Sequence, residues 1–145
     1  YKTKINNNQN NNIEYLSSND CILEEVIGDF EKIKQIIIQL IENAFKFTEK
    51  GYISFEIAKK RKENGILLVN FIIKDTGIGI TKEKQMKLFE KFEQGEHYLT
   101  KKHCGMGLGL AIVNDLVKLL TGNLTYETEL NKGTKFIVEI PLKLQ

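Results

Sequence analysis

The sequence has few cysteines, a net charge near zero and no long apolar run, and each shortage excludes a class of protein. Cys21 and Cys104 lie far apart and match no metal-binding spacing, so we expect reduced thiols in an intracellular protein. No apolar run approaches the roughly 18–20 residues that cross a membrane, and no signal peptide opens the sequence. The net charge of +2 is too small to indicate nucleic acid binding. We therefore expect a cytoplasmic domain without direct membrane contact.

The 145 residues suffice for one compact domain, and 41% hydrophobic with 28% charged residues is typical of a globular protein. The polar run NNNQNNN at 6–12 cannot bury enough apolar surface to order itself. We expect residues 1–12 to be a disordered or low-complexity lead segment and residues 13–145 to form the domain. The segments that flank the run, YKTKI and IEYL, are candidate strands.

Apolar residues at helical spacing predict two long helices and one short one. The first helix covers 29–47, with Asp29 as its N-cap. The last covers 107–121, with Gly122 at its C-cap position. A short helix is expected over 81–92, with the inner face Met86, Leu88, Phe89 and Phe92. Residues 93–106 show no periodicity and predict a long mobile loop, which is usually functional.

Alternation predicts strands at 52–58 and in a closing hairpin through Asn131-Lys132-Gly133, with Pro141 ending the last strand. The run ILLVNFIIK at 66–74 is apolar on both faces, as in a central strand. The order of elements fits an α/β two-layer sandwich. We expect a mixed sheet of about five strands, covered on one face by about three helices.

A polar stripe interrupts the apolar first helix. Gln39, Glu42, Asn43 and Lys46 stand at i, i+3, i+4 and i+7, which places them on one helix face. Amide and phosphate oxygens suit magnesium. Asn43 is our candidate metal ligand and Lys46 our candidate phosphate contact. The alternative from spacing alone is an ordinary solvent-facing stripe.

Two glycine-containing segments complete a candidate pocket. Asp75 ends the most apolar strand and is a candidate acceptor for an exocyclic amine, while Gly77 and Gly79 permit close backbone approach. The alternative there is a simple Asp-Thr-Gly turn. The run at 105–110 leaves backbone N–H groups free at a helix start, where they favour phosphate. A flexible connector is the alternative.

Together these segments resemble the catalytic, ATP-binding domain of two-component sensor histidine kinases. This family belongs to the wider group of heat-shock chaperone ATPases, type II topoisomerases and mismatch-repair ATPases. The resemblance covers about residues 13–142 and looks most like the hybrid kinases, whose relay ends in a receiver domain. It rests on QLIENAFKFT (39–48), DTGIGI (75–80), LFEKFEQ (88–94), GMGLGLAI (105–112) and GTKF (133–136).

The resemblance implies the Bergerat-type ATP-binding fold and a role for each matched residue. Asn43 coordinates Mg²⁺, with Gln39 as a second candidate ligand, and Asp75 receives the adenine amino group. Gly79 and Thr134 hold the base through ordered water. Residues 93–106 form the ATP lid, anchored by Phe89 and Phe92. The full set of nucleotide contacts that it implies is Asn43, Lys46, Phe47, Asp75, Gly77, Gly79, Ile80, Lys101, Gly105, Met106, Gly107, Leu108, Gly109, Leu110 and Thr134.

The implied reaction is transfer of the ATP γ-phosphoryl group to a histidine on a separate dimerisation domain, normally upstream. No side chain here is a certain catalytic residue, and Lys46 is expected to stabilise phosphate charge. A response regulator or receiver domain would be the next partner. We therefore expect an enzyme domain of a longer protein, whose membrane anchor, where it has one, lies outside this chain.

Four residues depart from the family pattern and keep two alternatives open. Gln39 replaces a second asparagine, Lys101 an arginine, Cys104 a glycine and Met106 a threonine. These changes affect phosphate handling more than adenine binding and motivate the first alternative, a nucleotide-sensing pseudokinase without phosphotransfer. The second alternative is a hydrolysing ATPase of the chaperone or topoisomerase type, with Glu42 as the base.

Overall fold

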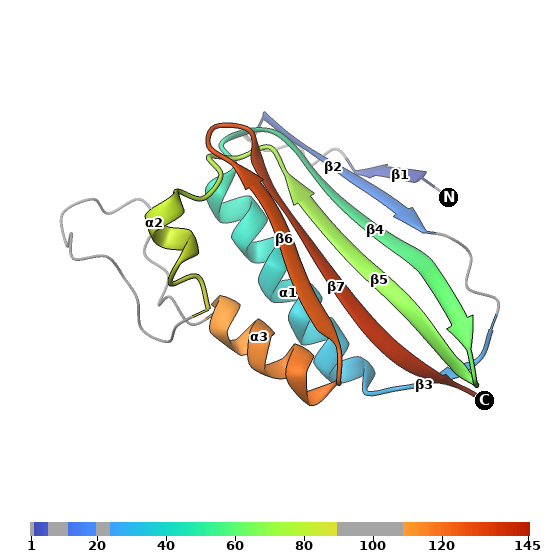
Figure 1. Ribbon diagram of the computed structural model, residues 1–145. Helices are drawn as coiled ribbons and strands as arrows, with labels where there is room; N and C mark the ends of the chain where they lie inside the picture. The colour runs from blue at the N-terminus through green and yellow to red at the C-terminus, as the bar shows by residue number, and fades with distance from the viewer. Residues whose placement is uncertain (1, 6–11, 20–23, 90–108) are drawn as a thin grey trace.

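The structure, a computed structural model, describes residues 2–5, 12–19, 24–89 and 109–145 and has two layers, a sheet and a set of helices (Figure 1). In order along the chain the elements are β1 (Lys2–Ile5), β2 (Asn12–Asn19), β3 (Val26–Ile27), α1 (Phe30–Phe47), β4 (Lys50–Glu63), β5 (Ile66–Asp75), α2 (Lys82–Gln85), α3 (Gly109–Leu119), β6 (Asn123–Glu129) and β7 (Gly133–Leu144).

The strands of the described residues form one mixed sheet in the order β1-β2-β4-β5-β7-β3, with β6 pairing with β7. The pair β2–β4 is parallel and all other pairs are antiparallel. The expected sandwich is therefore confirmed, with five longer strands and three helices. The short strands β1 and β3 extend the sheet beyond the five longer strands.

Helix α1 forms where its periodicity predicts it. The Asp29 side chain accepts a hydrogen bond from the backbone N–H of Lys32 at 3.1 Å, which satisfies one of the donors that a helix start leaves unpaired. The helix ends at Phe47, and Thr48 follows in an extended conformation. Its apolar stripe faces the sheet through the buried residues Ile33, Ile36, Leu40 and Ala44.

The core lies between the helices and one face of the sheet. Every second residue of β5 from Leu67 to Asp75 is buried, and the same alternation runs along β7 from Thr134 to Leu142. The apolar side chains among them pack in one cluster with those of α1 and with Val113 and Val117 of α3. Since α1 and α3 share this cluster, both helices cover the same face of the sheet (Figure 1).

The helix predicted over 81–92 is shorter than expected, and the prediction of its inner face is partly wrong. Helix α2 has four residues, and Met86 is 83% exposed instead of facing inward. After Gln85 the backbone tightens into i to i+3 hydrogen bonds, from Lys87 N to Lys84 O and from Leu88 N to Gln85 O. The helical period is therefore lost after one turn, while Leu88 still packs against the core.

Pro141 and Gly122 also differ from the roles that the sequence predicted for them at the ends of β7 and α3. Pro141 does not end β7 but lies inside it, opposite Leu68 of β5. On the other side of β7 the pairing with β6 stops at Glu139. Pro141 therefore lies at an edge position on that side, where a residue without an N–H is tolerated. After α3 the left-handed residue is Thr121 (φ 53°), while a Cβ on Gly122 would lie 2.5 Å from the Glu139 carbonyl oxygen. Gly122 thus serves close packing.

The candidate strands near the N-terminus are present as β1 and β2. Of the expected lead segment over 1–12, residues 2–5 and 12 belong to β1 and β2, while residues 1 and 6–11 lie outside the described residues, as does the expected lid over 93–106. Within the described part, no helix is long and apolar enough to cross a membrane.

The packing of α1 predicts a contrast between its two faces. Leu40 is 1% exposed and Ile38, two residues earlier, is 43% exposed. We expect Leu40→Ala to lower the free energy of unfolding by about 2–5 kcal/mol, because it leaves a cavity in the core. Ile38→Ala, the control, should change it by about 0.5 kcal/mol. Urea unfolding followed by circular dichroism measures both, and equal losses would contradict this packing.

Candidate functional site

The centre of the site is the carboxylate of Asp75 at the end of β5. Asp75 is 7% exposed and lies on the inner, helix-facing side of the sheet. Its Oδ1 accepts hydrogen bonds from the backbone N–H groups of Gly77 at 2.8 Å and of Thr134 at 3.3 Å. Burial raises the pKa of this carboxyl above the ordinary aspartate value, although the two N–H donors partly oppose the rise.

The two donors come from distant parts of the chain and leave one oxygen of the carboxylate without a donor. Gly77 belongs to the loop after β5, and Thr134 belongs to β7, which pairs with β5. Among the described residues no hydrogen-bond donor reaches Asp75 Oδ2. The carboxylate is therefore more than the first residue of a turn, since it also joins two strands and keeps an acceptor for a further donor.

The loop after Asp75 is attached to the end of α1. Ile78 donates its N–H to the carbonyl oxygen of Phe47 at 3.1 Å. A Cβ on Gly77 would lie 2.2 Å from the same oxygen, so only glycine fits there. Thr76 fastens the other side, because its Oγ1 accepts from the Tyr52 N–H at 2.9 Å. The C-terminal turn of α1 is thereby held beside Asp75.

Two threonines near this loop were not expected from the sequence. Thr128 of β6 accepts from the Ile80 N–H at 3.0 Å and lies 3.0 Å from the Thr134 hydroxyl oxygen. It faces Thr134 in the hairpin register, so the register of the predicted hairpin is the signal that could have identified it. Thr48, after α1, is 3% exposed, and its hydroxyl has no hydrogen-bond partner in the described part of the chain.

The polar stripe of α1 faces the start of α3. A Cβ on Gly109, the first residue of α3, would lie 2.9 Å from Gln39 Oε1 and 3.9 Å from Asn43 Oδ1. The stripe and the end of the glycine run are thus neighbours, as the sequence predicted. Gln39 also donates from Nε2 to Glu42 at 3.2 Å, so its amide is held between Glu42 and α3.

Lys46 and Phe47 lie beside each other at the last turn of the helix. The Lys46 ammonium stands 5.2 Å from the centre of the Phe47 ring, at cation–π distance. This turn also carries the Phe47 carbonyl that binds the loop after Asp75. A positive charge, an aromatic ring and a buried carboxylate are therefore connected through one helix end.

The donor set fits an adenine nucleotide with a magnesium ion. The buried Asp75 offers an acceptor to an amine, and Gly109 brings the start of α3 close to the side-chain amides of Gln39 and Asn43. In the described residues no three His, Cys, Asp or Glu side chains gather around a potential metal position. Amide and phosphate oxygens are the donors that magnesium accepts when its site is shared with a nucleotide.

The other predicted nucleotide contacts lie partly within and partly outside the described residues. Gly79 and Ile80 lie in the loop after β5, and Leu110 packs partly buried beside the core. Phe89 makes an edge-on contact with Tyr126, with ring centres 6.0 Å apart. The predicted contacts that lie outside the described residues are Lys101, Gly105, Met106, Gly107 and Leu108, together with the lid anchor Phe92.

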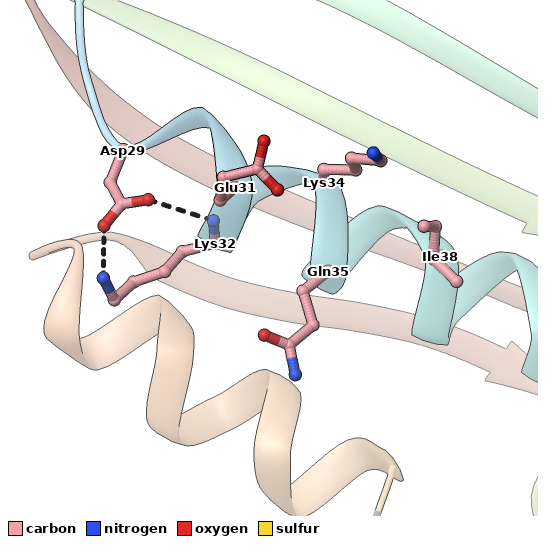
Figure 2. Close-up of a pocket in the computed structure, with 6 residues that line it drawn as sticks. All are labelled: Asp29, Glu31, Lys32, Lys34, Gln35 and Ile38. Atoms are coloured by element: carbon pink, nitrogen blue, oxygen red, sulfur yellow. Dashed lines mark hydrogen bonds and ion pairs between the residues drawn. The ribbon is translucent and has the colours of Figure 1, made fainter.

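A hollow lies at the N-terminal end of α1, away from the candidate site (Figure 2). It has a volume of about 480 Å³ and is lined by residues of the first helical turns and their N-cap. Asp29 and Lys32 form an ion pair there, so they satisfy each other. This hollow does not include any residue of the candidate site. Its lining is Asp29, Glu31, Lys32, Lys34, Gln35 and Ile38.

Comparison with known proteins identifies similar chains. The family described as histidine kinase-, DNA gyrase B- and HSP90-like ATPase matches residues 28–144. Histidine protein kinase 1 of Candida albicans is 36% identical over 132 residues, 90% of this chain and 5% of that protein. The signal transduction histidine-protein kinase BarA of Escherichia coli is 38% identical over 121 residues, 83% of this chain and 13% of that protein. The chain thus spans a small part of these curated relatives.

Solved structures agree in fold. Full-length ShkA in complex with AMPPNP superimposes with a TM-score of 0.75 at 30% identity, over 92% of this chain and 26% of that chain. The catalytic domain of histidine kinase ThkA, in a nucleotide-free form, gives a TM-score of 0.64 at 30% identity, over 90% and 80%.

The raised pKa of Asp75 predicts a pH dependence of stability. The folded protein binds this proton more readily than the unfolded chain, so stability rises as the pH falls through the raised pKa toward about 3.9. Asp75→Asn removes the titration but keeps an oxygen for Gly77 and Thr134. We expect wild type to gain stability over Asp75→Asn as the pH is lowered through this window, in urea unfolding. A constant or shrinking difference between the two proteins would contradict the burial.

Proposed function

Since the chain belongs to the family of histidine kinase-, DNA gyrase B- and HSP90-like ATPases, as a catalytic ATPase domain of the histidine kinase type, we propose that it binds Mg²⁺-ATP and donates the γ-phosphoryl group to a histidine. The receiving histidine would stand on a separate dimerisation domain of the same parent protein. The observation that carries the proposal is the buried Asp75 carboxylate, one oxygen of which has no donor in the described part of the chain, beside the end of the helix that carries Asn43 and Lys46.

Adenine recognition would depend on the end of the sheet. Asp75 would accept a hydrogen bond from the amino group of adenine, because its Oδ1 is occupied by backbone donors and its Oδ2 has no donor among the described residues. Thr134, on the next strand and 6% exposed, would hold the base through an ordered water. Phe47, at the end of α1, would cover one side of the base. The complex of the similar kinase ShkA with AMPPNP supports a nucleotide of this type.

Phosphate handling would depend on the two helices. Asn43 would hold magnesium, which when bound neutralises phosphate oxygens, and Lys46 would add a positive charge nearby. The first turn of α3, which lies against Gln39 and Asn43, would offer backbone N–H groups to phosphate. This chain would then act by positioning and charge stabilisation, and the receiving imidazole would supply the nucleophile.

The proposed partners follow from the same reaction. The γ P–O bond would be exchanged for a P–N bond to an imidazole nitrogen, with ADP as the leaving group. The phosphoryl group would then pass to the aspartate of a receiver domain or response regulator. Because this chain spans 5% and 13% of the length of two similar kinases, we propose that these domains belong to a longer parent protein.

Calorimetric titration with a non-hydrolysable ATP analogue tests the binding site. We expect wild type to bind and Asp75→Asn to bind about 10- to 100-fold more weakly, because a hydrogen bond to a charged acceptor is lost. Asp115→Asn, on an exposed position of α3, is the matched control and should bind as wild type. Unchanged affinity in Asp75→Asn would overturn the assignment of the adenine contact.

A second titration tests the metal ligand. We expect magnesium to tighten binding to wild type and to lose this effect in Asn43→Ala, because the amide oxygen is removed. Asn123→Ala, an exposed amide on β6, is the control and should keep the full effect. Should Asn43→Ala respond to magnesium as wild type does, another group holds the metal.

Phosphorylation in trans separates the kinase from the pseudokinase. The domain is incubated with γ-labelled ATP and the purified dimerisation domain of its parent, and acid-labile phosphate on that domain is measured. We expect transfer by wild type and a loss of at least about 10-fold in Asn43→Ala. If nucleotide binds and no phosphohistidine forms, the result favours the pseudokinase alternative. The position of Gln39, held between Glu42 and α3, is the structural feature that would account for it.

A further inference from the structure

Three side chains form a row across the inner face of the sheet at the candidate adenine site. Asp75 of β5 accepts the backbone N–H of Thr134 of β7, and Thr134 stands directly opposite Thr128 of β6 in the strand register. The two hydroxyl oxygens are 3.0 Å apart. Thr128 does not reach Asp75, and the resemblance to histidine kinases gives it no role.

Either hydroxyl can be the donor in the hydrogen bond between Thr128 and Thr134, and the other bonds of Thr128 favour one direction. A threonine hydroxyl has one proton and two lone pairs. Thr128 Oγ1 is 3.2 Å from the Gly133 carbonyl oxygen, which can only accept, and 3.0 Å from the Ile80 N–H, which can only donate. When Thr128 gives its proton to Gly133, the hydroxyl of Thr134 must be the donor in the bond between the two threonines.

With this direction of the bond, Asp75 and Thr134 offer only hydrogen-bond acceptors to a ligand. Thr134 uses its proton on Thr128 and keeps only lone pairs, while Asp75 when ionised has no proton to give. Two adjacent acceptors favour a partner with two N–H donors, or one such donor and a bridging water. The amino group at C6 of adenine has two hydrogens, whereas the keto oxygen of hypoxanthine or guanine would face lone pairs.

We propose that Thr128 is a positioning residue that makes the site selective for a C6 amine, by taking the proton of Thr134. The inference rests on the proposed binding of adenine nucleotide and adds a residue that strengthens its base selectivity. Thr128 does not touch the base and acts through Thr134. Without the Thr128 hydroxyl, Thr134 recovers its proton and can donate it to a keto oxygen.

The test compares ADP with inosine diphosphate, which carries a keto oxygen in place of the amino group. Calorimetry gives the ratio of the two affinities for wild type, Thr128→Val and Thr128→Ser. We expect wild type to prefer ADP and Thr128→Val to lower this preference about three- to tenfold, the range of one neutral hydrogen bond. Thr128→Ser keeps the hydroxyl and should restore the ratio.

The ratio separates this role from a structural one. Loss of the Ile80 partner in Thr128→Val can displace the loop, but that weakens both nucleotides alike and leaves the ratio unchanged. An unchanged ratio with ADP still bound therefore overturns the role of Thr128 and leaves the proposed function standing. Failure of wild type to bind ADP overturns both. Thr128→Ala, which is smaller, replaces the valine variant if thermal unfolding shows that the latter does not fold.

Discussion

The burial of one carboxylate is the constraint on which the site depends. Asp75 lies in the apolar inner face of the sheet, where an ionised group is costly unless donors surround it. The donors are backbone N–H groups of Gly77 and Thr134, which belong to different elements. Satisfying Asp75 therefore fixes the loop after β5 and the start of β7 together, and with them the threonine pair.

The same constraint explains why glycine is needed around Asp75. Gly133 has φ 109°, and a Cβ there would lie 2.1 Å from the Asp75 carbonyl oxygen. Gly77 is equally close to the end of α1. These approaches bring the helix that carries Asn43 and Lys46 to the end of the sheet that carries Asp75. Binding of a base and of its phosphates can thus be shared between two layers of the fold.

Much of this arrangement could be predicted from the sequence, because it depends on periodicity and local capping. The helical stripe from Ile33 to Ala44, the N-cap Asp29 and the central strand at 66–74 are properties of neighbouring residues, and the structure confirms them, although only one face of that strand is buried. The neighbourhood of Asn43 and Gly109 has no local signal, since α1 and α3 are far apart in the chain, and it was expected because the chemistry of both segments fits one nucleotide pocket.

What could not be predicted depends on tertiary contacts. Met86 has the right spacing for an inner face but is exposed, since the chain leaves the helix after one turn. Thr128 is recognisable only once the hairpin register places it opposite Thr134 and the loop brings Ile80 to it. The hydroxyl of Thr48, which has no partner within the described segments, likewise follows from packing and not from any local pattern.

The most direct test of the account is an amide NMR titration of the isotope-labelled domain with ADP. The account predicts that the signals of Gly77, Gly79 and Thr134, and those of the first turn of α3, shift together and saturate. The hollow at the start of α1 and the far hairpin at 59–66 should not respond. Shifts confined to the hollow around Asp29 and Gln35, with the Asp75 loop unchanged, would contradict the central claim that the nucleotide binds where the sheet end meets α1.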